Sequence, residues 1–191
     1  MLLYIHGFNS SPLSEKAKLT SAFINKRYPQ VNLQVPQIPS TPNGAKKLLE
    51  QLAETALNNN EPLAFIGSSL GGYLSTYLVN KYGGRAVLIN PAVKPYALFT
   101  DFLGEQYNPY TKEQYQVLPE HLEQLKEMDV PAIKRPDRFF VLLQTGDETL
   151  DYRDGLAKFH CCKMCLEAGG DHSFVGYASH LPEICQFLLL S

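Results

Sequence analysis

The feature that most constrains this chain is a Gly-x-Ser-x-Gly motif placed between an expected strand and an expected helix. The motif runs from Gly67 to Gly71, follows four apolar residues, and precedes a helix expected over residues 73–82. A serine at the apex of a sharp strand-to-helix turn is lifted out of the sheet, and the flanking glycines avoid clashes there. The motif therefore predicts Ser69 as a nucleophile with both glycines in support, an ordinary glycine-rich loop being the alternative.

Apolar runs and helical patterns alternate along most of the chain. Strands are expected over residues 2–5, 33–35, 63–66, 86–89, 139–143 and 161–166, and helices over 14–28, 41–57, 73–82, 119–128 and 179–190. This alternation predicts a single α/β domain over residues 1–191, with a mostly parallel sheet of about six strands between two layers of helices. Ligands bind such sheets at the carboxyl ends of the strands.

The alternation stops between residues 92 and 137, where a long connection is expected. It contains six aromatic residues before its one expected helix: Tyr96, Phe99, Phe102, Tyr107, Tyr110 and Tyr115. Connections of this length inside a compact domain are usually functional, so we expect a lid or cap whose aromatic residues line an acyl or aryl pocket. A satellite core under an excursion of the chain is an equally good interpretation.

A serine nucleophile needs a general base, and the chain contains five histidines. Three of them fall on or at the start of expected helices or strands: His121, His160 and His180. His172 instead follows an expected strand, in a loop with two glycines before it that allow the imidazole to reach a neighbouring strand end. His172 is the predicted base, and a solvated surface histidine is the alternative.

The acid that orients the base should follow a strand between nucleophile and base, because the chain order in this arrangement is serine, acid, histidine. Asp147 comes directly after Gly146 at the end of the strand expected over residues 139–144 and is the predicted acid. Asp151 is the second candidate if the intervening residues form a turn. Asp171 is too close in sequence to the base to orient it from the far side.

An oxyanion hole requires two backbone N–H groups, one of them from the residue after the nucleophile, here Leu70. The other is expected from an earlier strand-to-helix loop, and Phe8 occupies such a loop directly after the first strand. Gly7 permits the turn of that loop. His6 is expected to hold the loop in place rather than to act as a second base.

Composition excludes several classes of function. The chain has a net charge of −2 with no basic run, so no nucleic-acid partner is expected. No apolar run reaches the length of a membrane-spanning helix, and no signal-peptide pattern is present. We therefore expect a cytoplasmic protein that has no membrane partner. The four cysteines include one pair with the spacing of metal ligands, Cys162 and Cys165, but no second such pair. We therefore expect free thiols, and we expect neither a bound metal nor another cofactor.

Five segments together resemble the α/β-hydrolase superfamily and, more narrowly, the YqiA-type bacterial esterases. They are residues 4–12 (YIHGFNSSP), 66–73 (IGSSLGGY), 89–92 (INPA), 144–148 (QTGDE) and 170–174 (GDHSF). The resemblance extends over essentially the whole chain. It implies a compact hydrolase that lacks the first two strands of the superfamily, with Ser69, Asp147 and His172 as its triad and carboxylic esters of short acyl chains as its substrates.

The expected function is therefore that of a serine esterase, which acts on a small-molecule ester through an acyl-enzyme and uses no cofactor. Thioester, lactone or peptide cleavage would use the same residues and stays an alternative. A binding protein with a hydrolase fold and no turnover is the alternative from another class.

Overall fold

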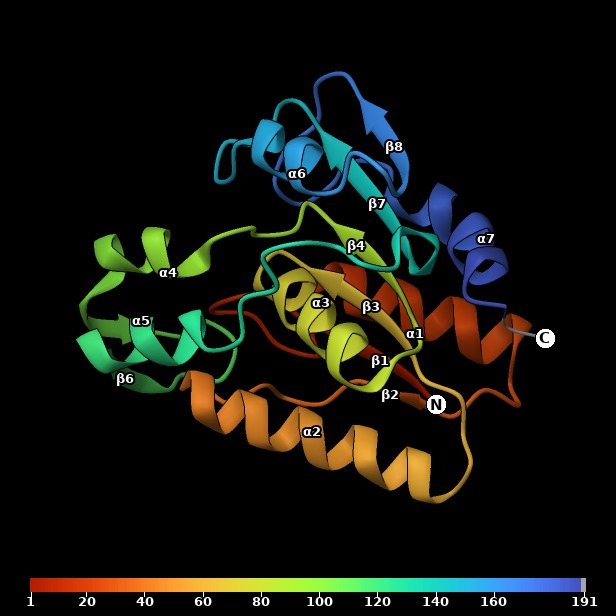
Figure 1. Cartoon of the computed structure of the whole chain (residues 1–191), viewed down its shortest axis with the longest axis horizontal. Helices are drawn as coiled ribbons and strands as arrows, with labels where there is room; N and C mark the ends of the chain where they lie inside the picture. The colour runs from red at the N-terminus through yellow and green to blue at the C-terminus, as the bar shows by residue number, and fades with distance from the viewer. Residues whose placement is uncertain (190–191) are drawn as a thin grey trace.

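The structure, a computed structural model, describes residues 1–189 of the chain. Within these residues, a six-stranded sheet has the order β2-β1-β3-β4-β7-β8 (Figure 1). Its strands are β1 (Leu2–Ile5), β2 (Leu33–Gln34), β3 (Ala64–Ser68), β4 (Arg85–Ile89), β7 (Phe139–Gln144) and β8 (Lys163–Glu167). Neighbouring strands of this sheet all pair in parallel, which confirms the predicted fold class.

Helices cover both faces of the sheet and create two cores (Figure 1). One face carries α1 (Glu15–Arg27) and α7 (Tyr177–Phe187), and the other carries α2 (Pro42–Asn58) and α3 (Leu70–Tyr82). Successive side chains of a strand point to opposite faces. Leu2 and Tyr4 of β1 therefore lie in the core beneath α1 and α7, whereas Leu3 and Ile5 lie in the core beneath α2 and α3.

Local sequence explains where α2 begins and which face it buries. The hydroxyl of Thr41 accepts a hydrogen bond from the amide of Gly44 at 3.3 Å, and Pro42 occupies the first turn, where its missing N–H costs little. Five residues of the helix are buried: Pro42, Ala45, Leu49, Ala53 and Ala56. The small alanine side chains among them allow α2 to pack beside α3, the helix that follows the Gly-x-Ser-x-Gly motif.

Helix α3 begins at Leu70, so its predicted start at Tyr73 was wrong by three residues. Gly71 and Gly72 have low helix propensity, which made the sequence pattern place the start after them. Both lie in close contact with neighbouring segments, and a Cβ atom on Gly72 would lie 2.7 Å from the Cβ atom of Pro91. Close packing therefore decides the start of this helix against local propensity.

Strand β8 begins at Lys163, two residues later than predicted. The preceding residues form a turn, in which the amide of Cys162 donates to the carbonyl of Phe159 at 2.8 Å. Phe159 is buried in the core, so the chain must turn around it before pairing with β7 can start. His160, which was expected to begin the strand, is an exposed residue of this turn.

Helix α7 begins at Tyr177 rather than at residue 179, so Pro182 lies inside the helix and not in its first turn. Three buried residues hold the helix on both sides of the proline: Tyr177, Leu181 and Ile184. Burial of this face outweighs the hydrogen bond that the proline removes. The predicted end of the helix at Leu190 lies outside the described residues.

A short helix after β7 was not predicted. α6 (Tyr152–Lys158) follows Asp151, whose carboxylate caps it by accepting from the amide of Arg153 at 2.9 Å. Gly155 in its middle faces β7, and a Cβ atom there would lie 3.0 Å from a methyl group of Leu143. Seven residues with a central glycine carry little helical periodicity, so only a turn was expected here.

The segment over residues 92–137 consists of short elements beside the sheet. They are α4 (Pro95–Leu98), the 3-10 helix η1 (Phe99–Phe102), a two-stranded antiparallel hairpin of β5 (Gly104–Tyr107) and β6 (Gln114–Val117), and α5 (Pro119–Lys126); a further 3-10 turn, η2 (Pro136–Arg138), leads into β7. Phe99, Val117 and Leu125 are buried and join the core beneath α2 and α3. Tyr107 and Tyr110 are exposed. The six aromatic residues thus divide between core packing and the surface.

None of the helices in the described part of the chain combines the length and the apolar character required to cross a bilayer.

Candidate active site

Ser69 occupies the sharp turn between β3 and α3, with φ of 56° and ψ of −120°. Few residues other than glycine adopt a positive φ, and such strain persists only where the surroundings enforce it. Close packing enforces it here: a Cβ atom on Gly67 would overlap the carbonyl oxygen of Gly71, and one on Gly71 would overlap that of Ile5. The two motif glycines therefore let the turn press against the end of β1.

Backbone hydrogen bonds fix the same turn between two strands. The amide of Ser69 donates to the carbonyl of Ile89 at 3.0 Å, and the carbonyl of Ser69 accepts from the amide of Ala92 at 3.1 Å. Both partners belong to the end of β4 and the residues that follow it. The position of the serine is therefore determined by main-chain contacts on both sides.

His172 and Asp147 are in direct contact, although 25 residues separate them in sequence. The Nδ1 atom of His172 lies 2.9 Å from each carboxylate oxygen of Asp147, whose side chain is only 2% exposed. The same carboxylate accepts from the amides of Thr149 at 2.9 Å and Leu150 at 2.8 Å. A carboxylate only accepts, so Nδ1 carries the proton and the lone pair of Nε2 stays available.

Asp151, the second candidate acid, lies elsewhere. It is exposed and binds Arg153 through both carboxylate oxygens, at 2.6–3.0 Å. Hydrogen bonds from the Arg153 side chain, and then from its amide, lower the pKa of Asp151 to about 2. Asp151 is thus an ionised helix cap that makes no contact with His172.

Side chains from two strand ends hold the loop that carries His172, residues 168–176, here named the base loop. The Oε1 atom of Gln144 accepts from the amides of Asp171 at 3.2 Å and Val175 at 2.9 Å. The Nδ2 atom of Asn90 donates to the carbonyl of Asp171 at 3.0 Å. These two strand ends therefore position the base loop from beneath.

A third side chain, Glu148, accepts from the amide of His172 at 3.0 Å. Hydrogen bonds from its own amide and from that of His172 lower the pKa of Glu148, so it accepts as a carboxylate. Sequence reasoning did not identify Asn90, Gln144 or Glu148. The available signal was a polar residue directly after each of two buried strands.

The loop after β1 approaches the serine closely. A Cβ atom on Gly7 would lie 3.1 Å from that of Ser69, so only glycine fits without displacement. His6 is buried, and its Nε2 atom accepts from the amide of Ile38 at 3.1 Å while Nδ1 lies 2.9 Å from the carbonyl oxygen of Gly7. Burial lowers the pKa of His6, which keeps the ring neutral. His6 thus holds the loop to the chain segment that follows β2.

Ser69 and His172 border one cleft of about 730 Å³ at the carboxyl ends of the strands. Tyr110 of the 92–137 segment also lines this cleft. Within residues 1–189, the serine hydroxyl makes no hydrogen bond to the imidazole, although the imidazole contacts Asp147. Contacts of this kind are often long in free enzymes and tighten when substrate binds.

Lys16 is another residue of the cleft that sequence reasoning missed. Its ammonium donates to the carbonyl of Ser173 in the base loop at 2.8 Å, and its side chain lines the cleft together with Ser69. Burial lowers the pKa of Lys16, against the opposing effect of nearby carboxylates, of which Asp171 is the strongest. In the sequence it resembled any solvated lysine of a first helical turn.

A second, much smaller pocket of about 30 Å³ lies beside the loop after β1. Phe8 and Leu70 contribute to its lining, as do Phe99 and Tyr115 from the 92–137 segment. The ring of Phe8 lies 4.6 Å from that of Phe99, centroid to centroid. The aromatic residues of that segment therefore narrow the space next to the two expected oxyanion donors.

The other three histidines lie outside the lining of the cleft. His121 is buried, and its Nδ1 atom accepts from the amide of Leu118 at 3.2 Å. His160 contacts the carbonyl of Ala157 at 2.9 Å. His180 lies 3.1 Å from a carboxylate oxygen of Glu167.

The profile of one protein family, described as "Uncharacterised protein family (UPF0227)", matches residues 1–189. The chain belongs to this family. A UPF0227 protein of Shewanella woodyi is 27% identical to it, over 98% of both chains. The UPF0227 protein YcfP of Salmonella gallinarum is 26% identical, over 100% of this chain and 99% of its own length. Members of UPF0227 are thus similar to this chain along their full length.

Solved structures similar to this UPF0227 chain are α/β-hydrolases. Est1E from Butyrivibrio proteoclasticus with bound ferulic acid has a TM-score of 0.70 at 12% identity, over 98% of this chain and 87% of its own. A putative hydrolase from Agrobacterium vitis S4 has a TM-score of 0.70 at 17% identity, over 100% and 87%. Mouse alpha/beta hydrolase domain-containing protein 10 has a TM-score of 0.63 at 16% identity, over 97% and 86%. The predicted α/β-hydrolase fold is therefore confirmed.

Proposed function

We propose that this protein is a serine hydrolase that cleaves carboxylic esters of short acyl chains through a covalent acyl-enzyme. The observation that carries the proposal is the contact of His172 with the buried carboxylate of Asp147, beside the cleft that Ser69 also borders. A serine on a strained turn, a histidine held in one tautomer and a buried carboxylate are the parts of a catalytic triad.

In the first half of the reaction, the hydroxyl oxygen of Ser69 attacks the ester carbonyl while Nε2 of His172 takes its proton. The hydrogen bond between Nε2 and the hydroxyl forms as the substrate binds. Asp147 keeps the proton on Nδ1 and stabilises the imidazolium that forms. The amides of Phe8 and Leu70 bind the oxyanion of the tetrahedral intermediate.

In the second half, the imidazolium gives its proton to the departing alcohol, which leaves the acyl group on Ser69. Water then attacks the acyl-enzyme, and His172 accepts a proton from that water as it did from the serine. Collapse of the second intermediate releases the carboxylic acid and returns the proton to the serine oxygen.

The preference for short acyl chains is supported by the small pocket beside Phe8 and Leu70. Its volume of only about 30 Å³ leaves little room beside the two expected oxyanion donors, which favours the shortest acyl chains over long ones. The wider cleft of about 730 Å³ would take the alcohol part of the ester. In this proposal residues 92–137 act as a cap, with Phe99 and Tyr115 closing the acyl side and Tyr110 facing the cleft.

Two alternatives remain from the sequence. A thioester would meet the same nucleophile, base and oxyanion donors, so ester and thioester substrates must be compared directly. A hydrolase-fold binding protein would have no use for a buried carboxylate that holds one tautomer of a cleft histidine. The buried contact between Asp147 and His172 therefore favours an enzyme.

Labelling with a fluorophosphonate probe tests the proposal, because the probe reacts only with an activated serine. We expect stoichiometric labelling of the natural protein and none of Ser69→Ala. Ser68→Ala is the matched control, since Ser68 is the adjacent, buried serine and should leave labelling unchanged. A series of esters of increasing acyl length should then show kcat/KM falling beyond the shortest chains.

Labelling of a correctly folded Ser69→Ala variant, or no labelling of the natural protein, would overturn the proposal. Faster turnover of a matched thioester than of the ester would assign the protein to the thioesterases instead. Equal kcat/KM for short and long acyl chains would contradict the role given to the small pocket.

A further inference from the structure

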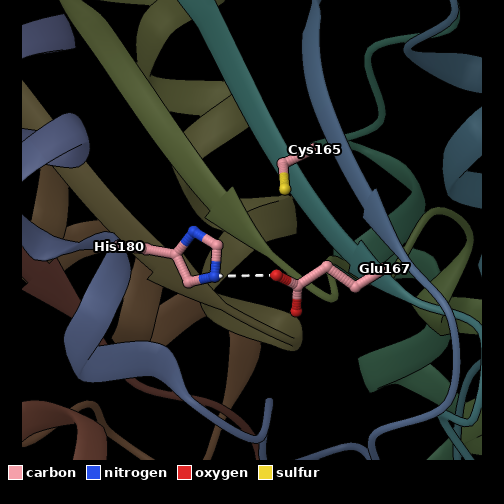
Figure 2. Close-up of side chains that lie close together, drawn as sticks. All are labelled: Cys165, Glu167 and His180. Carbon is pink, nitrogen blue, oxygen red and sulfur yellow. Dashed lines mark ion pairs between the residues drawn. The ribbon is translucent and has the colours of Figure 1, made fainter.

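Three potential metal ligands come together away from the catalytic cleft: Cys165, Glu167 and His180 (Figure 2). Their ligating atoms all lie within 4.8 Å of one another, and Nε2 of His180 is 3.1 Å from Oε1 of Glu167. Cys165 and Glu167 are two residues apart along β8, so both side chains lie on the same face of the sheet. His180, in the first turn of α7, faces them across the layer (Figure 2).

This set of ligands matches a transition metal such as zinc. Thiolate, imidazole and carboxylate are the three groups that bind Zn²⁺ in proteins, at about 2.0–2.3 Å. A tetrahedral site with such bonds places ligand atoms about 3.3–3.8 Å apart. The three atoms lie within 4.8 Å of one another and one pair is 3.1 Å apart, so side-chain adjustments of about 1 Å or less would bring all three onto one cation. A hard cation such as Mg²⁺ prefers oxygen ligands and fits poorly.

The surroundings of the cluster also suit a cation. The carboxylate of Glu167 has an oxygen within 4.8 Å of the Cys165 sulfur, and its negative charge would stabilise a positive ion at this place. The positive charge of Lys163 would oppose a bound cation. Its ammonium forms an ion pair with Glu183 at 2.9 Å, so it does not neutralise the carboxylate of Glu167.

A second layer of contacts orients the ligands, as is usual around bound metals. The Nε2 atom of Gln144 donates to Oε2 of Glu167 at 2.8 Å, which leaves Oε1 directed at His180. The edge of the His180 ring meets Phe174, with ring centroids 5.4 Å apart. Two of the three ligands are therefore held in place before any cation binds.

We propose that Cys165, Glu167 and His180 form a binding site for a zinc-class divalent metal ion, with a fourth coordination position open to water. Glu167 is the last residue before the base loop, and His180 follows that loop in the first turn of α7. A bound ion would therefore join the two ends of the loop that carries His172. We expect it to restrain the base loop, which the Gln144 side chain also contacts.

Titration of the chelator-treated full chain with Co²⁺, followed by displacement with Zn²⁺, tests the site directly. We expect one ion per chain and a thiolate-to-cobalt charge-transfer band that Cys165→Ser removes. Since loss of an outer partner alone weakens binding by about 10- to 100-fold, loss of a ligand in Cys165→Ser or His180→Gln should weaken it by about 100-fold or more. Hydrogen exchange of residues 168–176 should slow when Zn²⁺ is added.

Matched controls separate this site from other groups that attract zinc. Cys161→Ser and Cys162→Ser remove neighbouring thiols that lie outside the cluster and should leave affinity unchanged. His172→Ala removes the histidine of the catalytic cleft and should also leave it unchanged. An unaltered affinity in folded Cys165→Ser, or a loss in His172→Ala, would overturn the proposal. Absence of stoichiometric binding would mean that the cluster is only an ion pair beside a thiol. None of these readouts depends on the proposed esterase activity.

Discussion

The nucleophile turn, residues 67–72, and the base loop, residues 168–176, place their side chains by different means. In the nucleophile turn, Cβ atoms on Gly67 or Gly71 would overlap backbone carbonyl oxygens. In the base loop, Cβ atoms on Gly169 or Gly176 would meet nothing within 4 Å, and one on Gly170 would overlap a side chain, that of Gln144, rather than main chain. The first region is fixed by close packing of main chain, whereas the second has open space around much of its backbone.

The base loop is held in position by polar side chains, whereas the nucleophile turn is held by close packing. Gln144, Asn90 and Glu148 all bind main-chain groups of the loop, and Asp147 binds the imidazole itself. The serine is thus held rigidly, and the histidine is held by hydrogen bonds that can lengthen or shorten. In the proposed reaction His172 takes up and releases a proton twice per turnover, and this freedom would suit that role. The two regions should accordingly fail in different ways when they are altered.

The largest effect on activity is expected from Asp147→Asn, which alters the buried carboxylate that contacts His172 of the base loop. The amide oxygen can still accept from Thr149 and Leu150, so the amide NH₂ would face Nδ1 of His172. That arrangement reverses the tautomer and leaves no lone pair on Nε2 to take the serine proton. We expect kcat/KM for a short-chain ester to fall by about 10⁴-fold, the usual cost of this replacement in serine hydrolases.

Asp151→Asn is the matched control for that experiment, because Asp151 is a neighbouring carboxylate that binds only Arg153 and its helix. It should change kcat/KM by less than about twofold, since surface substitutions rarely cost more than about 0.5 kcal/mol. Thermal melting of both variants would separate a loss of catalysis from a loss of fold. A similar rate loss in both would contradict the choice of acid.

The nucleophile turn should be broken most severely by Gly71→Ala. The added methyl group would overlap the carbonyl of Ile5, and backbone on both sides would have to move. We expect the free energy of unfolding to fall by at least about 3 kcal/mol, or soluble protein to be lost. Urea denaturation measures this directly.

Gly169→Ala is the corresponding glycine-to-alanine change in the base loop. Its φ of +76° disfavours alanine, yet the new methyl group would have open space. The expected cost is about 1–2 kcal/mol, due to backbone strain alone. Equal destabilisation by the two substitutions would show that the two regions do not differ as the structure indicates.

The same difference explains how much of the site could be predicted from sequence. The order of strands and helices follows from local apolar runs, and the nucleophile turn is encoded by adjacent glycines around Ser69. Asp147 and His172 were selected by their positions after strands, and the structure places them in contact. Local sequence was sufficient to bring these two residues together because each follows a recognisable strand, and their catalytic role stays a prediction.

Residues whose role depends on distant partners could not be found in this way. Gln144 ends a buried strand and reads as a solvated polar residue until the base loop is placed above it. In the β5–β6 hairpin, β6 alternates polar and apolar residues over only four positions and β5 does not alternate, so the pattern was too short to predict the hairpin. Cys165 was considered only with Cys162, whereas the fold places it beside Glu167 and His180. Tertiary contacts decide each of these cases.

The most informative change in the base loop is Gln144→Leu. This change leaves the shape of the strand end but removes an amide that binds Glu167 and Val175 on one side and Asp171 on the other. Buried main-chain groups of the loop would lose their partners, at a cost of about 1–3 kcal/mol in stability. We expect the loosened loop to lower kcat about tenfold with little change in KM, because the serine and the small pocket are untouched.

Gln34→Leu is the matched control, since Gln34 also ends a strand of the sheet but is exposed and binds only Asn32. Hydrogen exchange of residues 168–176 should accelerate in Gln144→Leu and stay unchanged in Gln34→Leu, while exchange around residues 67–72 should be slow in both. An equal acceleration in the two regions would mean that Gln144 supports the whole sheet edge rather than the base loop. The Gln144 side chain can be removed without directly disturbing the nucleophile, because the hydrogen bonds that hold Ser69 come from the main chain of Ile89 and Ala92.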